Sequence, residues 1–198
     1  MTVSFGNQYS IQMSYGRESA KYNGFSFYSP VPATPALPKN AIVYAMTHVN
    51  PDTNSICQLL SKIHTIAVVG LSPNSSRPSF RVAQVLQQAG YHIVPVRPLI
   101  DNVLGEQAYP DLQSIPFPID LVDVFRAPEH VPAIVESCIN LGINNLWLQD
   151  GVIHDEAASV ARLAGINVVM DRCMARDYVQ LCKSGEHARI IEAHQPNG

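Results

Sequence analysis

The segment from Gly70 to Ser79 has the residue types of a phosphate-binding loop. It reads Gly-Leu-Ser-Pro-Asn-Ser-Ser-Arg-Pro-Ser and joins an apolar β-branched run to a segment with helical periodicity. A helix N-terminus has unpaired backbone N–H groups and a positive dipole potential, which together favour a bound phosphate. Pro78 suits the first position of that helix, and Arg77 adds a planar cation that binds phosphate through paired hydrogen bonds. The alternative is that the serines only cap the helix and that Arg77 is solvated.

The same loop lacks the motifs of two common nucleotide sites. The dinucleotide motif GxGxxG needs three glycines, whereas this loop has only Gly70, and a Walker A lysine is missing, which excludes ATP hydrolysis by that route. The dinucleotide motif also needs an acidic residue at the end of the second strand. Here Val96 is followed by Arg97 and Pro98. A cation at this place suits a phosphorylated ribose, as in NADP or coenzyme A (CoA).

Regular alternation of apolar segments predicts how this loop is positioned. Strands are expected at residues 65–70, 92–96, 120–125, 145–149 and 166–171, and helices at 55–63, 78–90, 128–142 and 154–165. A turn at Leu104-Gly105 and a short helix near 111–114 are expected between the second and third strands. Such alternation predicts an α/β fold with a parallel sheet and helices on both faces. Ligands of open α/β sheets bind at the carboxyl ends of the strands, where the Gly70–Ser79 loop would lie.

The chain divides into three parts by composition. We expect a flexible N-terminal extension at residues 1–50, a folded domain at 51–183 and a C-terminal tail at 184–198. A transit peptide is a weaker interpretation of the first part, because Arg17 is the only arginine before Arg77. Another interpretation is that natural translation starts at Met46.

Composition and charge exclude several classes of function. The 13 Lys and Arg against 16 Asp and Glu give a net charge of -3, so no basic surplus favours nucleic acid. No apolar stretch approaches the roughly 20 residues that cross a bilayer. We expect no secretory signal, because the start MTVSFGNQYS has no cationic region followed by an apolar one. The four cysteines match no zinc template, so we expect reduced thiols in a cytoplasmic protein, with Cys57 and Cys138 in the core.

Several short motifs together resemble one known family. The motifs, in chain order, are IAVVGLSPNSSRPSFRVAQVL, GYHIVPV-P, VLGEQAY, VDVFR, LWLQ-GV and NVVMDRC. They resemble the small stand-alone CoA-binding proteins, which are single Rossmann-like domains akin to the N-terminal domain of the succinyl-CoA ligase α subunit. The resemblance spans Ile56 to Cys173 and implies a five-stranded Rossmann-like domain, for which we expect the strand order 3-2-1-4-5.

The resemblance also implies where CoA would bind. The loop residues Gly70, Leu71, Ser72, Arg77, Pro78 and Ser79 would hold the pyrophosphate. The edge at Val96, Arg97 and Pro98 would flank the adenosine, and Phe125 and Arg126 would line the path of the pantetheine arm. The chain departs from the family at Arg97, where a small polar residue is common, and at Asp150, where an apolar residue is common. Arg97 could strengthen a contact with the 3′-phosphate, or it could obstruct the adenine edge. Asp150 would oppose an anionic ligand if its side chain points inward.

Cys173 lies where the pantetheine thiol would arrive. A thiol beside Arg172 favours its thiolate, so a mixed disulfide with CoA is one hypothesis. The alternative is a packed small residue. Asp171 and Arg172 are expected to form a local ion pair or to brace the loop; a contact with the ligand is a third alternative.

Catalytic chemistry has little support in the sequence. No Ser-His-Asp order, paired-carboxylate motif or metal triad stands out, and His154 is best explained as a residue near a helix cap. The leading hypothesis is therefore non-catalytic binding of CoA or an acyl-CoA. One alternative is an NADP-binding oxidoreductase, although no Tyr-x-x-x-Lys pair is present. Another is a protein-interaction subunit that has lost its ligand; an oligomer or a protein partner is neither predicted nor excluded.

Overall fold

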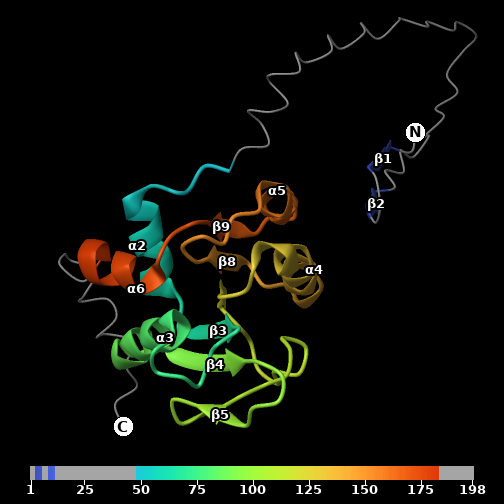
Figure 1. The fold of residues 1–198 in the computed structure, drawn as a ribbon. Coiled ribbons are helices and arrows are strands. Elements are labelled where there is room, and N and C mark those ends of the chain that lie inside the picture. The colour runs from blue at the N-terminus through green and yellow to red at the C-terminus, as the bar shows by residue number, and fades with distance from the viewer. Residues whose placement is uncertain (1–2, 6–8, 12–47, 183–198) are drawn as a thin grey trace, which may run out of the picture. The chain divides into compact units, whose positions relative to one another are not determined.

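A five-stranded parallel sheet forms the centre of the domain in the computed structural model, which describes residues 3–5, 9–11 and 48–182. The strands are β3 (Thr65–Val69), β4 (His92–Val96), β7 (Leu121–Val124), β8 (Asn145–Leu148) and β9 (Asn167–Val169). Their lateral order is β4-β3-β7-β8-β9, and every neighbouring pair is parallel (Figure 1). All five expected strands are present, and no end differs from its expected position by more than two residues.

Helices cover both faces of this sheet. One face carries α2 (Thr53–Lys62), α3 (Pro78–Gln88), α6 (Met174–Asp177) and the π-helical turn η2 (Tyr178–Cys182). The opposite face carries α4 (Val131–Leu141), which follows the 3-10 turn η1 (Pro128–His130), and α5 (Asp155–Leu163) (Figure 1). The predicted class, a Rossmann-like α/β fold with helices on both faces, is therefore confirmed.

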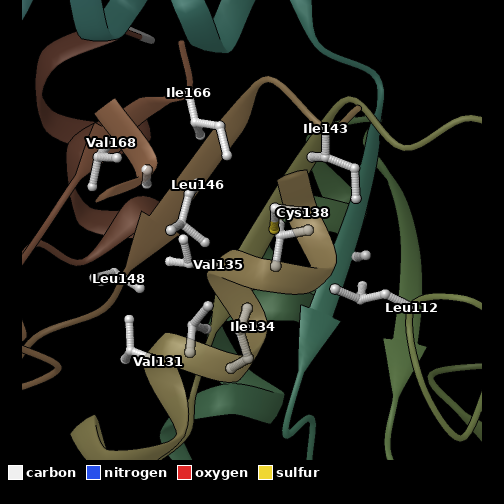
Figure 2. Packing of buried hydrophobic residues seen from close by; sticks show 14 of the residues in the cluster. Leu112, Val131, Ile134, Val135, Cys138, Ile143, Leu146, Leu148, Ile166 and Val168 are labelled. Atoms are coloured by element: carbon white, nitrogen blue, oxygen red, sulfur yellow. The ribbon is translucent and has the colours of Figure 1, made fainter. Parts of the chain in front are cut away.

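The core beneath α4 and α5 shows why these segments form helices and strands. Val131, Ile134, Val135 and Cys138 recur at helical spacing, and all four are buried on the inner face of α4. Figure 2 shows them pointing toward the side chains of the neighbouring strands, including Leu146. The helix ends at Gly142, whose φ of 67° suits a residue without a side chain.

The strand order differs from the expected 3-2-1-4-5. In order of sequence, the observed arrangement is 2-1-3-4-5, because the third strand, β7, lies beside β3 on the side away from β4. The outer edge of β4 is occupied by the connection that follows it: Tyr109 N donates to Pro95 O, and Arg97 N donates to Tyr109 O. The start of β7 is fixed beside β3 because the Asp120 carboxylate accepts hydrogen bonds from the backbone of residues 64 and 65.

The connection between β4 and β7 contains a hairpin instead of a helix. Strands β5 (Asn102–Val103) and β6 (Glu106–Gln107) pair around the predicted turn at Leu104-Gly105. The short helix expected near 111–114 is only a turn, in which the Asp111 carboxylate accepts from the backbone and hydroxyl of Ser114.

Two of the four cysteines are joined. Cys57 on α2 and Cys182 in η2 form a disulfide across 125 residues, so the expectation of four reduced thiols is wrong for this pair. Sequence spacing did not indicate the pairing, because it depends on η2 packing beside α2. Cys138 is buried as expected, and Cys173 is half-buried and free. The cytoplasmic location stays a prediction.

The N-terminal part holds a separate small feature. Strands β1 (Val3–Phe5) and β2 (Tyr9–Ile11) pair antiparallel, and the sequence did not predict them. The proposed start at Met46 and the tail at 184–198 lie outside the described residues. Within the described residues, no helix has the length and apolar character needed to cross a membrane.

Candidate functional site

The carboxyl ends of β3, β4, β7 and β9 bring the predicted site segments to one edge of the sheet. Gly70 follows β3 and donates its backbone N–H to Val96 O at the end of β4, over 2.9 Å. Phe125 N donates to Val69 O at the same distance. The three segments therefore lie at the carboxyl edge of the sheet, as the sequence predicted. The segment that begins at Gly70 lies between those of Arg97 and Phe125, whereas the expected strand order had placed Arg97 in the middle.

Gly70 allows a close approach of the backbone that a larger residue would prevent. Its φ of 90° lies in the left-handed region. A Cβ atom at this position would lie 2.7 Å from Phe125 O and 3.0 Å from Arg126 Cδ. The absent side chain thus lets the β7 segment, with Arg126, lie directly against the start of the loop.

Hydrogen bonds within the loop fix its conformation. Ser79 is buried, and its hydroxyl accepts a hydrogen bond from Ser72 N over 3.1 Å. The Asn74 side-chain oxygen accepts from both the backbone and the hydroxyl of Ser76. Leu71 is fully buried and anchors the loop in the core. The loop is therefore organised before any ligand arrives.

The N-terminus of α3 has no side-chain cap. Arg77 is the N-cap residue and makes no capping hydrogen bond, and Pro78 occupies the first position of the helix. Ser72, Ser76 and Ser79 bond within the loop, so the alternative in which the serines only cap the helix is wrong for these three. Arg77 is exposed to solvent, as the same alternative stated. The N–H groups of Ser79 and Phe80 therefore keep the capacity to bind an anion.

Two arginines stand beside this helix end. Arg77 is exposed, and its side chain has no hydrogen bond or ion pair to any residue of the described domain. Arg126 is also exposed, packs over Gly70, and lies with Nη2 3.0 Å from Nε2 of His130. In that contact the guanidinium N–H donates and the imidazole nitrogen accepts. The sequence analysis did not single out His130.

A cleft of about 480 Å³ lies at the outer end of β4. Its lining comprises Arg97, Leu99, Ile100, Asp101, Gln107, Ala108 and Pro110. Val96 is buried beneath this end of the strand, whereas Pro98 and Leu99 are exposed. Arg97 therefore borders a concave surface, on the opposite side of Gly70 from Arg126.

Cys173 lies at the start of α6 and packs, like Phe125, against the core beneath α3. The expected ion pair between Asp171 and Arg172 is wrong, because Arg172 pairs with Asp177 at 2.6 Å. Asp171 instead braces a loop, as the alternative expectation stated, by accepting a hydrogen bond from Gly151 N.

The negative charge of the Asp150 carboxylate is balanced by an ion pair with Arg176. It accepts two hydrogen bonds from Arg176, at 2.8 and 3.0 Å. This contact holds the pKa of the Arg176 guanidinium above its ordinary value, with further contributions from nearby acidic groups. Asp150 therefore opposes an anionic ligand less than its sequence position suggested.

His154 has the structural role that the sequence favoured. It is the N-cap residue of α5, and its Nδ1 accepts a hydrogen bond from Ala157 N over 3.2 Å. The acidic residues of the first turn follow directly, where the helix dipole favours them. The imidazole therefore caps the N-terminus of α5.

A buried polar pair near the site was missed. Asp123 on β7 is fully buried, and its Oδ1 accepts a hydrogen bond from Gln149 Nε2 over 2.7 Å. Burial raises the pKa of the Asp123 carboxyl to about 7, although the bonds from Gln149 and the Val124 backbone lower it. The signal in the sequence was an acid inside the otherwise apolar run LVDVF.

A parallel sheet with helices on both faces is a Rossmann-like domain, and an open helix N-terminus beside exposed arginines at its carboxyl edge is the kind of place where such domains bind phosphate groups. The sequence pattern of the CoA-binding domain family matches residues 64–178, and the chain belongs to that family.

Three relatives illustrate the similarity. The chain is 39% identical over 125 residues to the uncharacterized protein YneT of Bacillus subtilis, an alignment that covers 63% of this chain and 93% of YneT. A hypothetical protein from Pyrococcus horikoshii has a similar solved structure, with 34% identity, a TM-score of 0.64, and coverage of 66% of this chain and 92% of that one. An ADP-forming acetate–CoA ligase of Archaeoglobus fulgidus is 31% identical over 81 residues, which are 40% of this chain and 12% of the ligase.

Proposed function

We propose that the protein binds coenzyme A or an acyl-CoA at the Gly70–Ser79 loop and does not transform it. The observation that carries this proposal is the uncapped N-terminus of α3, flanked by the exposed side chains of Arg77 and Arg126. A diphosphate at this point would accept hydrogen bonds from backbone N–H groups and neutralise two cations. The family match and the name of the related acetate–CoA ligase support CoA as the ligand.

The remaining predicted residues would line the rest of an extended CoA molecule. Arg97 and the cleft beside it would receive the adenosine and its 3′-phosphate. Phe125 is half-buried at the end of β7, beside Gly70, and would line the pantetheine arm. Cys173 would lie near the thiol end, either as the partner of a mixed disulfide with CoA or as a packed small residue.

Calorimetry with CoA tests the binding site. We expect Arg77→Ala and Arg126→Ala each to weaken CoA binding roughly tenfold or more, since each removes a charge-assisted hydrogen bond. Lys62→Ala is the matched control, because Lys62 is an exposed cation at the end of α2, beside the opposite edge of the sheet. Equal affinity of the wild type and both arginine variants would refute the proposed site.

Comparing the affinities for CoA, 3′-dephospho-CoA and NADP shows which cofactor the protein prefers and tests the role of Arg97. The wild type should bind CoA more tightly than 3′-dephospho-CoA, and Arg97→Ala should remove that difference. NADP should bind weakly, and NADPH should not be consumed with carbonyl substrates. Tighter binding of NADP than of CoA, or NADPH turnover, would favour the oxidoreductase. If no CoA binds and the arginine variants retain a protein partner, the interaction-subunit hypothesis gains support.

A further inference from the structure

Gln149 lies in the same row of side chains as the start of the loop. Strand register pairs Val69 with Val124 and Val124 with Leu148. One residue further along each strand, Gly70, Phe125 and Gln149 therefore form a row at the carboxyl edge of the sheet. Gln149 stands two strand spacings from Gly70, about 10 Å away.

Asp123 is two residues before Phe125 on β7, so its side chain lies on the same face of the sheet, further from the carboxyl edge. Register places it between Val68 and Trp147, whose side chains belong to the apolar core beneath α3 and α6. Alternation along a strand directs Asp123 and Phe125 to one face, and Trp147 and Gln149 likewise. The bond from Gln149 Nε2 to Asp123 Oδ1 is thus a diagonal contact between the edge row and the row beneath it.

This contact fixes which end of the Gln149 amide faces outward. The amide nitrogen is engaged by Asp123, and the amide oxygen accepts no hydrogen bond from the described residues. Only two buried side-chain polar atoms in the described part of the chain lack a partner, His48 Nδ1 and Asp123 Oδ2. The Gln149 oxygen is not one of them, so solvent still reaches it although the residue is only 3% exposed.

Packing alone does not explain an acid at position 123. Its Oδ2 is buried without a partner, and an unsatisfied polar atom in an apolar core destabilises the fold. Burial also raises the pKa of this carboxyl to about 7. Residues that oppose stability in this way are more often kept for a functional site.

We propose that Gln149 recognises the arm of the ligand, with its amide oxygen accepting a hydrogen bond from a secondary amide N–H, and that Asp123 positions Gln149 for this contact. The inference rests on the proposed function, because a CoA molecule whose diphosphate lies at α3 would extend its pantetheine arm across the end of β7 toward β8. That arm carries two secondary amides. Gln149 is thus a binding residue, and Asp123 acts through it.

The test compares ligands with and without the arm. Calorimetry would use CoA, acetyl-CoA and adenosine 3′,5′-bisphosphate, which has the 3′-phosphate and the first phosphate of the diphosphate but no pantetheine. We expect Gln149→Leu to weaken CoA and acetyl-CoA equally, by roughly threefold to tenfold, and to leave the bisphosphate affinity unchanged. Gln88→Leu is the matched control, since Gln88 is exposed at the far end of α3.

Variants of Asp123 separate positioning from a merely structural role. Asp123→Asn keeps an oxygen acceptor for the Gln149 amide, so its CoA affinity should stay within about twofold of the wild type. Asp123→Val removes the acceptor and should weaken CoA as Gln149→Leu does, again without effect on the bisphosphate. If Asp123→Val does not fold, Gln149→Leu and Asp123→Asn together still decide the question.

Each result has a distinct meaning. Unchanged CoA affinity in Gln149→Leu, or equal weakening of CoA and the bisphosphate, would overturn the inference. If Gln149→Leu weakened the binding of CoA but not of acetyl-CoA, the donor to Gln149 would be the CoA thiol, and the inference of an amide contact would be overturned. A loss of CoA affinity in Asp123→Asn as large as in Asp123→Val would contradict the positioning role. Failure of the wild type to bind either CoA or the bisphosphate would instead refute the proposed function.

Discussion

Replacing Asp123 with Asn should stabilise the protein more at high pH than at low pH. Burial raises the pKa of this carboxyl from 3.8 to about 7 in the folded protein. An upward shift of about three units corresponds to about 4 kcal/mol, since one unit is worth about 1.4 kcal/mol. Asn has the same shape and does not ionise, so it removes this pH-dependent contribution.

The sign follows from proton binding. Between the two pKa values the folded state keeps the Asp123 proton and the unfolded state loses it. The free energy of unfolding therefore falls as pH rises from about 4 to about 7, and it is lowest above the folded pKa. About two of the three pH units between the unfolded and folded pKa values lie above pH 5. From pH 5 to pH 8 the free energy of unfolding of Asp123→Asn, relative to that of the wild type, should therefore rise by about 3 kcal/mol.

Urea denaturation of the wild type and Asp123→Asn at these two pH values measures the effect. An unpartnered Asn amide at the position of Oδ2 adds a penalty that does not depend on pH, so the difference between the two pH values is the test. Asp101→Asn, at an exposed position, is the control. A stability difference between wild type and Asp123→Asn that is the same at both pH values would refute the account of a buried, proton-binding carboxyl.

Three further predictions concern stability and thiol reactivity. Gly70→Ala should destabilise the fold by about 2 kcal/mol or more in denaturant titrations, because of its positive φ and the close Phe125 carbonyl; an unchanged midpoint would contradict the geometry. Reducing the Cys57–Cys182 disulfide should lower the melting temperature, because the bond closes a long loop; the free energy of unfolding should fall by up to about 5 kcal/mol. The reductant should not change the melting temperature of the Cys182→Ala variant. Burial raises the pKa of the Cys138 thiol to about 12, so this thiol should react with a disulfide reagent only after unfolding; labelling in the native protein would show that the site opens.

The sequence predicted the local elements and the phosphate-binding loop because both are encoded in short segments. The run TIAVVG has β-branched residues and ends in Gly70, and the helix after it begins at Pro78. Both features act through the backbone preferences of neighbouring residues. The loop therefore lies between β3 and α3 as predicted, and its role as the site is a proposal.

The lateral order of the strands could not be predicted in the same way. Periodicity indicates that a segment is a buried strand but does not identify its neighbour in the sheet. Here the neighbour depends on Tyr109, which occupies the outer edge of β4, and on Asp120, which joins the start of β7 to β3. Both contacts connect distant residues through ordinary polar groups that carry no motif.

The disulfide and the buried polar pair depend on tertiary packing. Cys57 and Cys182 are 125 residues apart, and their proximity follows from η2 packing beside α2. Asp123 and Gln149 meet only because β7 and β8 are paired in one register. An acid within an apolar run was nevertheless visible in the sequence, and such a residue merits attention as a candidate site residue.

A crystal structure of the protein grown with CoA tests the central claim most directly. The account predicts the diphosphate at the N-terminus of α3, within hydrogen-bond distance of the backbone N–H groups of Ser79 and Phe80 and beside Arg77 or Arg126. CoA bound elsewhere on the domain, with the N-terminus of α3 facing only water, would contradict it.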